Sequence, residues 1–569
     1  MAILHRQSTD RTTKKAKKSP EGQSARMGVI PAAVFLVFSI LYCATGTSYN
    51  TFDAVSYSNQ IAHLYPRTGD AHWLFHPHHL LFNATGYVLW SMARALGYHG
   101  GPLVALETFN AIVGALGITL FYMTLRRLMQ RSNWLPVIVA SGLGLSFGYW
   151  ICATDARVNA MSTTLLMASF AVLCSNFEFA RLRHAAAAGL LAGLAVLYHE
   201  SSGLFLFVGL SALAVMPSRA PRLRLAATFV GAWAVVVGLG YLIVGGLVLK
   251  LHSPTAFHSW SSEYSELGWW WNFHIFHNVR LDAYALRHAA FVEPPGKRGT
   301  FHLAADTPTG LLALYFATLI GWAIGIYYFV AALPLLWRTH YRPILIMSVV
   351  WIALYAAFFT VWSPGYFVFW VPALVPISLI LALTMAHYRS RRGGVMVNWL
   401  VGAWIAMFAT VNVMSSIGPH LAPQASPFQR IALEYRAHSA PGDIVLMAGV
   451  GDLSELEVNI PYFADRQAIS AHAALTRAHD DSTQAIASMQ EAVQSTLAAG
   501  HSVYIVDDLY DMPRNSGVVS GLEAHHHGVD PDQLKSLFAP WNVEPAWTSS
   551  HGPVWKLTPK TEATSPSLL

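Results

Sequence analysis

The chain has 569 residues, of which 54% are apolar and only 12% are charged, with a net charge of +6 at pH 7. Soluble globular proteins carry about 25% charged residues, so this composition leaves too little polar surface for several water-soluble domains. The mean hydropathy of +0.40 and the 19 tryptophans indicate a chain that lies largely in lipid, and they exclude disorder, collagen and coiled coil. Each of Cys43, Cys152 and Cys174 lies in an apolar run, which predicts three buried thiols rather than a disulfide framework.

Eleven apolar segments approach the length of about 20 residues that a membrane helix needs. They cover residues 28–48, 103–124, 134–153, 158–178, 185–199, 203–217, 225–249, 310–337, 344–362, 367–387 and 395–415. A further apolar stretch, 79–97, is interpreted as a juxtamembrane or re-entrant helix, because a full crossing there would reverse the side of every later loop. The sequence therefore predicts an α-helical polytopic membrane protein of about 11 transmembrane helices, with residues 28–415 as the membrane domain.

The basic residues set the predicted orientation, since cytoplasmic loops retain Lys and Arg. With residues 1–27 as a cytoplasmic basic tail, that tail and the inner loops hold 20 of the 36 Lys and Arg residues, and the opposite loops hold 8. We interpret the lysines of the tail as a topology signal rather than a nucleic-acid site. The N-terminus is then inside and the C-terminus outside, and the outer side carries the loops 49–102 and 250–309.

The segment 416–558 is predicted to form a small extracytoplasmic α/β domain. A helical stretch before the apolar run 444–447 and a second helix before the run 503–506 give helix, turn and buried strand twice, which is typical of a parallel sheet. Neither strand is followed by a nucleotide-binding glycine motif. Residues 559–569 are predicted to be a disordered end.

Asp53 lies a few residues after the first span and is the leading candidate for catalysis. A carboxylate that faces a cavity at the membrane surface can take a proton from an acceptor hydroxyl as it attacks a sugar carbon. The alternative is an ordinary loop acid or helix cap. Further along the same loop, the run from His76 to His79 invites a metal site, but no His-Glu-x-x-His spacing brings two ligands together. We favour a phosphate or sugar contact by His76 or His79.

Asp155 and Arg157 stand two residues apart in the turn between two predicted spans. Ionisable groups at the edge of the membrane are costly, so they mark either a site or a mutual ion pair that anchors the turn. In the first case Arg157 holds a phosphate with its planar guanidinium, and Asp155 orients Arg157 or the substrate.

Three further outer residues are predicted to bind substrate. His199 and Glu200 lie in a turn so short that its polar groups must face the same outer vestibule as the two aspartates. Tyr366, in another outer turn, can line that cavity. The loop 250–309 is interpreted mainly as an interfacial belt, although its tryptophans also suit sugars and lipid chains.

Together these elements resemble the C-type membrane glycosyltransferases (GT-C fold), whose relatives include protein O-mannosyltransferases and lipid A aminoarabinose transferases. The resemblance covers residues 28–415. Its elements are the inside N-terminus, Asp53 after the first span, His76-Pro77, Arg126-Arg127 at the end of an apolar span, Asp155-Ala156-Arg157, and the run from Leu191 to His199.

The resemblance implies transfer of a sugar from a polyprenyl-phosphate-linked donor, usually with inversion, on the outer face of the membrane. The acceptor would be a lipid, a glycan or a protein, and the location a bacterial cell (inner) membrane. Asp53 would be the base, Asp155 the second catalytic acid, and Arg157 the group that stabilises the leaving phosphate. The other predicted substrate-binding residues are His76, His79, His199, Glu200 and Tyr366. No metal or other cofactor is required by that scheme, and no nucleic acid is expected as a partner.

Two other classes of function also accommodate the sequence. A secondary transporter would explain eleven spans, but it usually shows paired halves with polar or broken helices at mid-membrane, whereas here the charge lies at one face. A non-catalytic assembly factor of the cell envelope would use the α/β segment as a binding module. Loss of activity in a folded Asp53→Asn protein separates the enzyme from such a factor.

Overall fold

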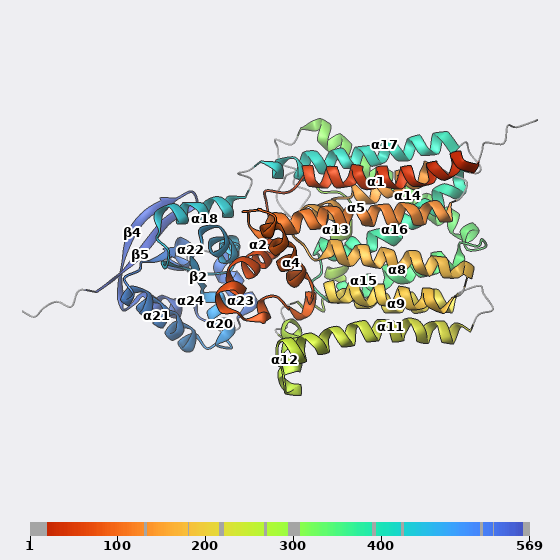
Figure 1. Ribbon diagram of the computed structural model, residues 1–569. Coiled ribbons are helices and arrows are strands. Elements are labelled where there is room, and N and C mark those ends of the chain that lie inside the picture. Colours follow the sequence, from red (N-terminus) through yellow and green to blue (C-terminus); the bar gives the residue numbers. More distant parts are fainter. Residues whose placement is uncertain are drawn as a thin grey trace, which may run out of the picture.

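The structure is a computed structural model that joins a helical bundle to a C-terminal α/β domain, with the short helices α2 and α4 between them (Figure 1). It describes residues 20–129, 134–179, 181–215, 221–266, 270–293, 308–389, 394–422, 426–512, 516–526 and 529–560, with the backbone alone for residues 20–28, 176–179, 263–266 and 531. Most of the predicted basic tail, part of the loop 250–309 and nearly all of the predicted disordered end lie outside these ranges.

Within the described residues, six helices are long and apolar enough to cross a membrane. They are α5 (Pro102–Leu128), α11 (Arg222–Leu242, extended to Val248), α14 (Thr309–Leu336), α15 (Arg342–Phe359), α16 (Val371–Arg389, preceded by a turn from Phe367) and α17 (Gly394–Asn412, extended to Ile417). A seventh candidate is a pair bent by 65°, α6 (Leu135–Gly144) and α7 (Phe147–Thr154). The predicted polytopic helical architecture is therefore confirmed in outline.

Four shorter apolar helices complete the bundle. They are α1 (Pro20–Ala44), α8 (Asn159–Phe179), α9 (Leu182–Tyr198) and α10 (Phe205–Ala214). With the six long helices and the bent pair, they coincide with the eleven segments that the sequence marks as spans. Cys152 and Cys174 are buried as predicted, but Cys43 on α1 is exposed, because the buried face of this helix is formed by Val34, Phe38 and Tyr42 and Cys43 lies off it. The prediction that all three thiols are buried is wrong for Cys43.

Residues 49–102, the predicted first outer loop, fold into short helical pieces at the end of the bundle next to the α/β domain (Figure 1). They are α2 (Phe52–Asn59), Gln60–Leu64, α3 (Tyr65–Thr68), Ala71–Trp73, Pro77–His79 and α4 (Phe82–Ala95). The ambiguous stretch 79–97 is thus mainly α4, a helix of 14 residues that is too short for an ordinary span. In the second outer loop, α12 (Pro254–Glu266) and α13 (Ile275–Ala290) flank the ends of the long helices.

The α/β domain is built on a five-stranded sheet of order β2-β1-β3-β5-β4. The strands are β1 (Ile444–Met447), β2 (Gln467–Ser470), β3 (Val503–Val506), β4 (Trp541–Ser549) and β5 (Gly552–Pro559). The helical elements are α18 (Pro427–His438), α19 (Leu456–Asn459), α20 (Ala471–Arg477), α21 (Ser482–Ala498), α22 (Asp507–Tyr510), α23 (Ser516–His525) and α24 (Pro531–Leu534), with one-turn or π-helical segments at Gly451–Leu453, Ile460–Ala464 and Lys535–Phe538.

The two predicted strands, β1 and β3, are fully buried and pair in parallel. Helices cover both faces of this part of the sheet, which is why the two strands are continuous apolar runs. The sequence analysis did not predict the antiparallel pair β4 and β5. These strands add an edge to the sheet, with Val554 of β5 beside Val506 of β3, and β4 alternates between partly buried and exposed side chains as a half-covered strand does.

Polar and apolar contacts join the two domains. Arg67 of α3 donates a hydrogen bond to Asp465, and His63 Nδ1 lies 3.5 Å from the same carboxylate. Tyr462 and Phe463, in the segment just before Asp465, pack against the core of the bundle. These contacts fix one edge of the α/β domain over the first outer loop.

Close packing of α9 on α11 depends on small residues. Gly189 and Gly193 lie four residues apart and share one face of α9. A Cβ atom on Gly189 would lie 2.2 Å from the carbonyl oxygen of Phe229, and one on Gly193 would lie 2.9 Å from that of Trp233. Both obstacles are backbone atoms of α11, so the two helices approach each other more closely than a side chain would allow.

We therefore expect Gly189→Ala to destabilise the bundle by about 1–3 kcal/mol, the usual cost of overpacking, and to lower the midpoint of thermal unfolding in detergent. Gly231→Ala on α11 is the matched control, because its Cβ atom meets nothing within 4 Å and alanine favours the helix. An equal or higher midpoint for Gly189→Ala would show that the helices do not approach in this way.

Candidate active site

A cavity of about 890 Å³ lies where the bundle meets the α/β domain, and every site residue predicted from the sequence lines it. These residues are Asp53, His76, His79, Asp155, Arg157, His199, Glu200 and Tyr366. They come from four segments that the sequence analysis places on the outer side, so their convergence agrees with a common side for those loops. The cavity is built by tertiary contacts between turns far apart in the chain.

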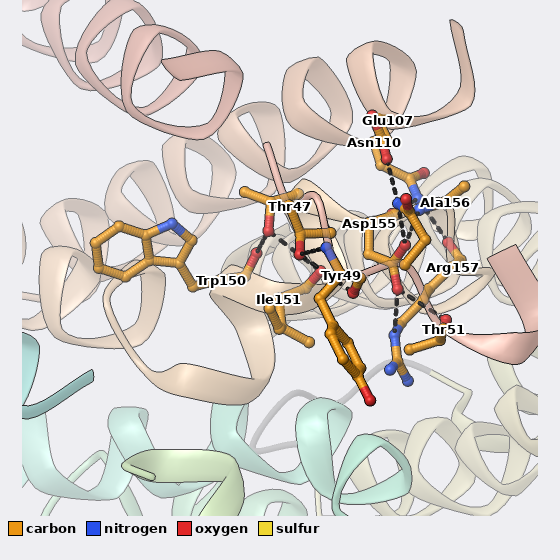
Figure 2. A network of polar contacts seen from close by, with 12 residues as sticks. Thr47, Tyr49, Thr51, Glu107, Asn110, Trp150, Ile151, Asp155, Ala156 and Arg157 are labelled. Carbon is orange, nitrogen blue, oxygen red and sulfur yellow. Dashed lines mark hydrogen bonds and ion pairs between the residues drawn. The ribbon is translucent and has the colours of Figure 1, made fainter. Parts of the chain in front are cut away.

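The polar centre of the cavity is the Asp155–Arg157 pair in the turn between α7 and α8 (Figure 2). Arg157 Nε donates to Asp155 Oδ2 at 3.1 Å, and Thr51 Oγ1 donates to the same oxygen at 2.8 Å. Asp155 Oδ1 accepts from the Ala156 N–H at 2.9 Å and from Asn50 Nδ2 at 3.4 Å. Both side chains are almost fully buried. These hydrogen bonds fix the Asp155 carboxylate, which in turn holds the guanidinium of Arg157 in one orientation.

The backbone of this turn is held as firmly as its side chains. Asn110 of α5 donates to the carbonyl oxygens of Asp155 and Arg157, at 2.8 and 2.7 Å. Asn50 also donates to Glu107 Oε1 at 2.6 Å, which connects the turn to α5. The sequence analysis missed Asn50, Glu107 and Asn110, because nothing in the local sequence distinguishes a positioning amide from any other polar residue of a helix or loop.

Asp53, in the first turn of α2, has a different environment. It lines the cavity, and no described donor forms a hydrogen bond with its carboxylate. Burial raises the pKa of the Asp53 carboxyl above its usual value, Arg157 opposes that change, and Asp155 adds to it. Asp53 is therefore a carboxylate with open acceptor positions, whereas the oxygens of Asp155 are occupied.

The histidines form the opposite wall of the cavity. His76 and His79 stack at 4.6 Å between ring centroids, and His78 Nδ1 lies 2.7 Å from Glu200 Oε1. Burial lowers the pKa of His76 to about 3 and that of His79 well below its usual value, so both rings are neutral at pH 7. His199 Nδ1 lies 2.7 Å from Ser201 Oγ.

His78 is a site residue that the sequence motif contained but that we did not single out. Its partner, Glu200, is one of the residues that the sequence predicts to bind substrate. Pro77 begins the one-turn helix Pro77–His79, which is separate from α4, and Tyr241 of α11 donates a hydrogen bond to its carbonyl oxygen at 2.6 Å. Among the described residues, no group of three or more His, Cys, Asp or Glu side chains is arranged to hold a metal ion.

Tyr366 and the aromatic residues around it form the third side of the cavity. Arg157 donates to Tyr366 Oη at 3.4 Å. The turn that carries Tyr366 is fixed by α13, since Asp282 accepts from Thr360 Oγ1 at 2.8 Å and from the Gly365 N–H at 3.4 Å. The predicted belt loop therefore positions a site residue. The other aromatic lining residues are Tyr49, Phe52, Tyr57, Phe147, Trp270, Phe358, Phe359, Trp362, Phe367 and Phe369.

One lining residue comes from the α/β domain. Glu455, which directly precedes α19, reaches the same cavity as Asp53 and Arg157. Burial raises the pKa of Glu455 to about 7, with smaller contributions from Asp53 and Asp155 that Arg157 opposes. The sequence analysis missed Glu455, because no motif surrounds it and its position depends on how the domains dock.

The two aspartates should respond differently to truncation. We expect Asp155→Ala to destabilise the folded protein by about 3–5 kcal/mol, because it leaves the buried guanidinium of Arg157 without its counter-ion. Asp53→Ala should leave stability unchanged or raise it at neutral pH, because the raised pKa of Asp53 means that its ionisation opposes folding there. Thermal unfolding in detergent, followed by tryptophan fluorescence, measures both. Equal losses of stability in the two variants would contradict the different environments assigned to Asp155 and Asp53.

Comparison with known proteins supports the fold. No protein-family model matches the sequence, and no curated protein matches it. By structure, the chain is similar to ArnT from Cupriavidus metallidurans bound to undecaprenyl phosphate, with a TM-score of 0.55 and 13% identity over 95% of this chain and 98% of that one. The apo state of the same ArnT gives a TM-score of 0.53 and 13% identity over 94% and 98%. This likeness confirms the fold predicted from the sequence.

Proposed function

We propose that this chain, which has the fold of the C-type membrane glycosyltransferases, transfers a sugar from a polyprenyl-phosphate-linked donor to an acceptor at the outer face of a membrane. The observation that carries the proposal is the pairing, in one cavity, of a carboxylate with open acceptor positions, Asp53, and a buried guanidinium, Arg157. The structural neighbour that holds undecaprenyl phosphate supports this class of lipid as the donor's carrier.

Asp53 acts as the base in this proposal. It takes the proton of the acceptor hydroxyl while the hydroxyl oxygen bonds to the anomeric carbon of the sugar. The bond from that carbon to the phosphate oxygen breaks, and polyprenyl phosphate leaves with the electron pair. Attack from the face opposite the phosphate inverts the anomeric configuration.

Arg157 stabilises the charge that develops on the leaving phosphate. It is the only Arg or Lys among the described residues that line the cavity, and its orientation is set before substrate binds. A donor that is already in place, in a site with little water, lowers the barrier more than one that must reorient. Tyr366 Oη lies beside the guanidinium and lines the same part of the site.

Asp155 serves as a positioning residue in this mechanism, in place of the catalytic role expected from the sequence. Both of its oxygens already accept hydrogen bonds, including the one from Arg157 Nε. An acceptor hydroxyl would have to displace one of those donors before Asp155 could take its proton. The geometry supports Asp53 alone as the base.

The remaining walls of the cavity contact different parts of the donor, one the lipid chain and the other the sugar. The aromatic side around Trp362 and Phe369 offers the isoprenoid chain an apolar surface. The neutral rings of His76 and His79, together with the His78–Glu200 pair, offer hydrogen-bonding groups to sugar hydroxyls. We infer a multi-pass protein of a bacterial inner membrane, with a lipid, glycan or protein as acceptor.

Lipid-resolved mass spectrometry of the purified protein tests this function. Wild type should carry a polyprenyl-phosphate sugar, whose mass also identifies the sugar, and Arg157→Ala should lose it, because the phosphate loses its counter-charge. Arg280→Ala, an exposed arginine of α13 outside the cavity, is the matched control and should keep the lipid. Absence of the lipid from wild type, or its retention by a folded Arg157→Ala protein, would contradict the proposal.

With the lipid identified, Asp53→Asn tests the base. Transfer should fall by about 10²–10⁴-fold, the range that general bases contribute, while lipid binding stays unchanged. A base must be ionised, so kcat/KM of wild type should fall as pH decreases through the pKa of Asp53, and that acid limb should lie above the usual value of 3.8. Transfer by Asp53→Asn at the wild-type rate would remove Asp53 from the mechanism.

A further inference from the structure

The loop after β1 carries Glu455 from the α/β domain into the cavity of the membrane domain. Gly449 and Gly451 both adopt left-handed backbone conformations in this loop, with φ of +78° and +75°. A Cβ atom on Gly451 would lie 3.2 Å from backbone atoms of α23, so glycine is required for the path that the chain takes. The following helix, α19, packs against α2, which bears Asp53.

The carboxyl group of Glu455 has an open position on its buried side. Its Oε2 atom is buried and forms no hydrogen bond, although the backbone carbonyl of Glu455 accepts from Asn459 Nδ2 at 2.7 Å. An unpartnered carboxyl oxygen that lines a cavity is a position for a ligand atom.

The charges around Glu455 favour its neutral form. Asp53 on α2 and the Asp155–Arg157 pair line the same cavity and interact electrostatically with Glu455. On its own segment, Asp452 is exposed, and Glu457 accepts from Ser470 Oγ at 2.9 Å outside the cavity. Two carboxyl groups close to each other do not both ionise easily, so one of them holds a proton. Burial has the largest effect, and together with these smaller charge effects it raises the pKa of Glu455 to about 7.

A neutral carboxyl group suits a phosphate, whereas an ionised one repels it. Arg157 and Tyr366, whose Oη lies 3.4 Å from the guanidinium, both line this cavity and can donate hydrogen bonds to such a phosphate. We propose that neutral Glu455 donates a hydrogen bond from its carboxyl O–H to the phosphate of the lipid-linked donor, so that the α/β domain completes the phosphate site. This inference rests on the proposed function and adds a second domain to the site.

The inference predicts how phosphate binding depends on pH. As pH rises through the pKa of Glu455, the O–H donor is lost and a negative charge appears beside the phosphate. The affinity of wild type for the lipid phosphate should therefore fall from below pH 7 to above it. Glu455→Gln keeps an N–H donor and cannot ionise, so its affinity should lack this fall and retain only the dependence that the phosphate itself contributes.

Binding of undecaprenyl phosphate to the purified full-length protein, measured on both sides of pH 7, provides the test. We expect Glu455→Ala to weaken binding below pH 7 by roughly 10- to 100-fold, as for loss of a hydrogen bond to a charged group. Glu455→Gln should bind within a few-fold of wild type there and more tightly than wild type above pH 7. Asp452→Asn, an exposed acid of the same loop outside the cavity, should follow wild type at every pH.

Four outcomes would overturn the assignment. If the affinities of wild type and Glu455→Gln for undecaprenyl phosphate change with pH in the same way, the ionisation of Glu455 does not affect phosphate binding. Wild-type binding by a folded Glu455→Ala protein shows that the side chain does not contact the phosphate. An affinity that rises more steeply with pH in wild type than in Glu455→Gln assigns Glu455 to a cationic group instead. Failure of wild type to bind at any pH overturns the proposed function as well, which separates that failure from one confined to Glu455.

Discussion

The buried ion pair between Asp155 and Arg157 is the constraint on which the site depends. Moving two charges out of water costs several kcal/mol for each ion, and their attraction offsets that cost only when the geometry is good and the remaining valences are satisfied. Here Thr51, Asn50 and the Ala156 N–H satisfy the carboxylate. The result is a guanidinium whose orientation is already fixed beside the cavity.

That ion pair also decides which carboxyl groups of the cavity have oxygens free to contact a substrate. A carboxylate that must satisfy a buried arginine has no free oxygen for a substrate, so the mechanism that we propose leaves proton transfer to Asp53. Glu455 differs from both, because it arrives from the other domain with a buried oxygen that has no partner. Asp53, Asp155 and Glu455 thus differ in their hydrogen bonding through their surroundings, although their side chains are chemically alike.

The α/β domain is part of the site because of where its sheet directs the chain. The loop after β1 leaves the carboxyl edge of the parallel strands and leads directly to Glu455 and α19, which packs on α2. Arg67, His63 and Asp465 hold the neighbouring edge of the domain. Ligand sites commonly form outside the carboxyl ends of parallel strands, and here that edge faces the membrane domain.

The sequence by itself determined the membrane character, the positions of the apolar helices and eight of the residues that line the cavity. Apolar runs of membrane length and short polar turns are local properties, and a helix in lipid must satisfy its own backbone hydrogen bonds, so these patterns fix helices without reference to the rest of the chain. Tertiary structure decided which residues meet. The free oxygens of Asp53, the occupied ones of Asp155, the His78–Glu200 pair and the place of Glu455 all depend on contacts between segments far apart in the chain. Burial and hydrogen bonding at those contacts set what each side chain can do, and no local pattern records them.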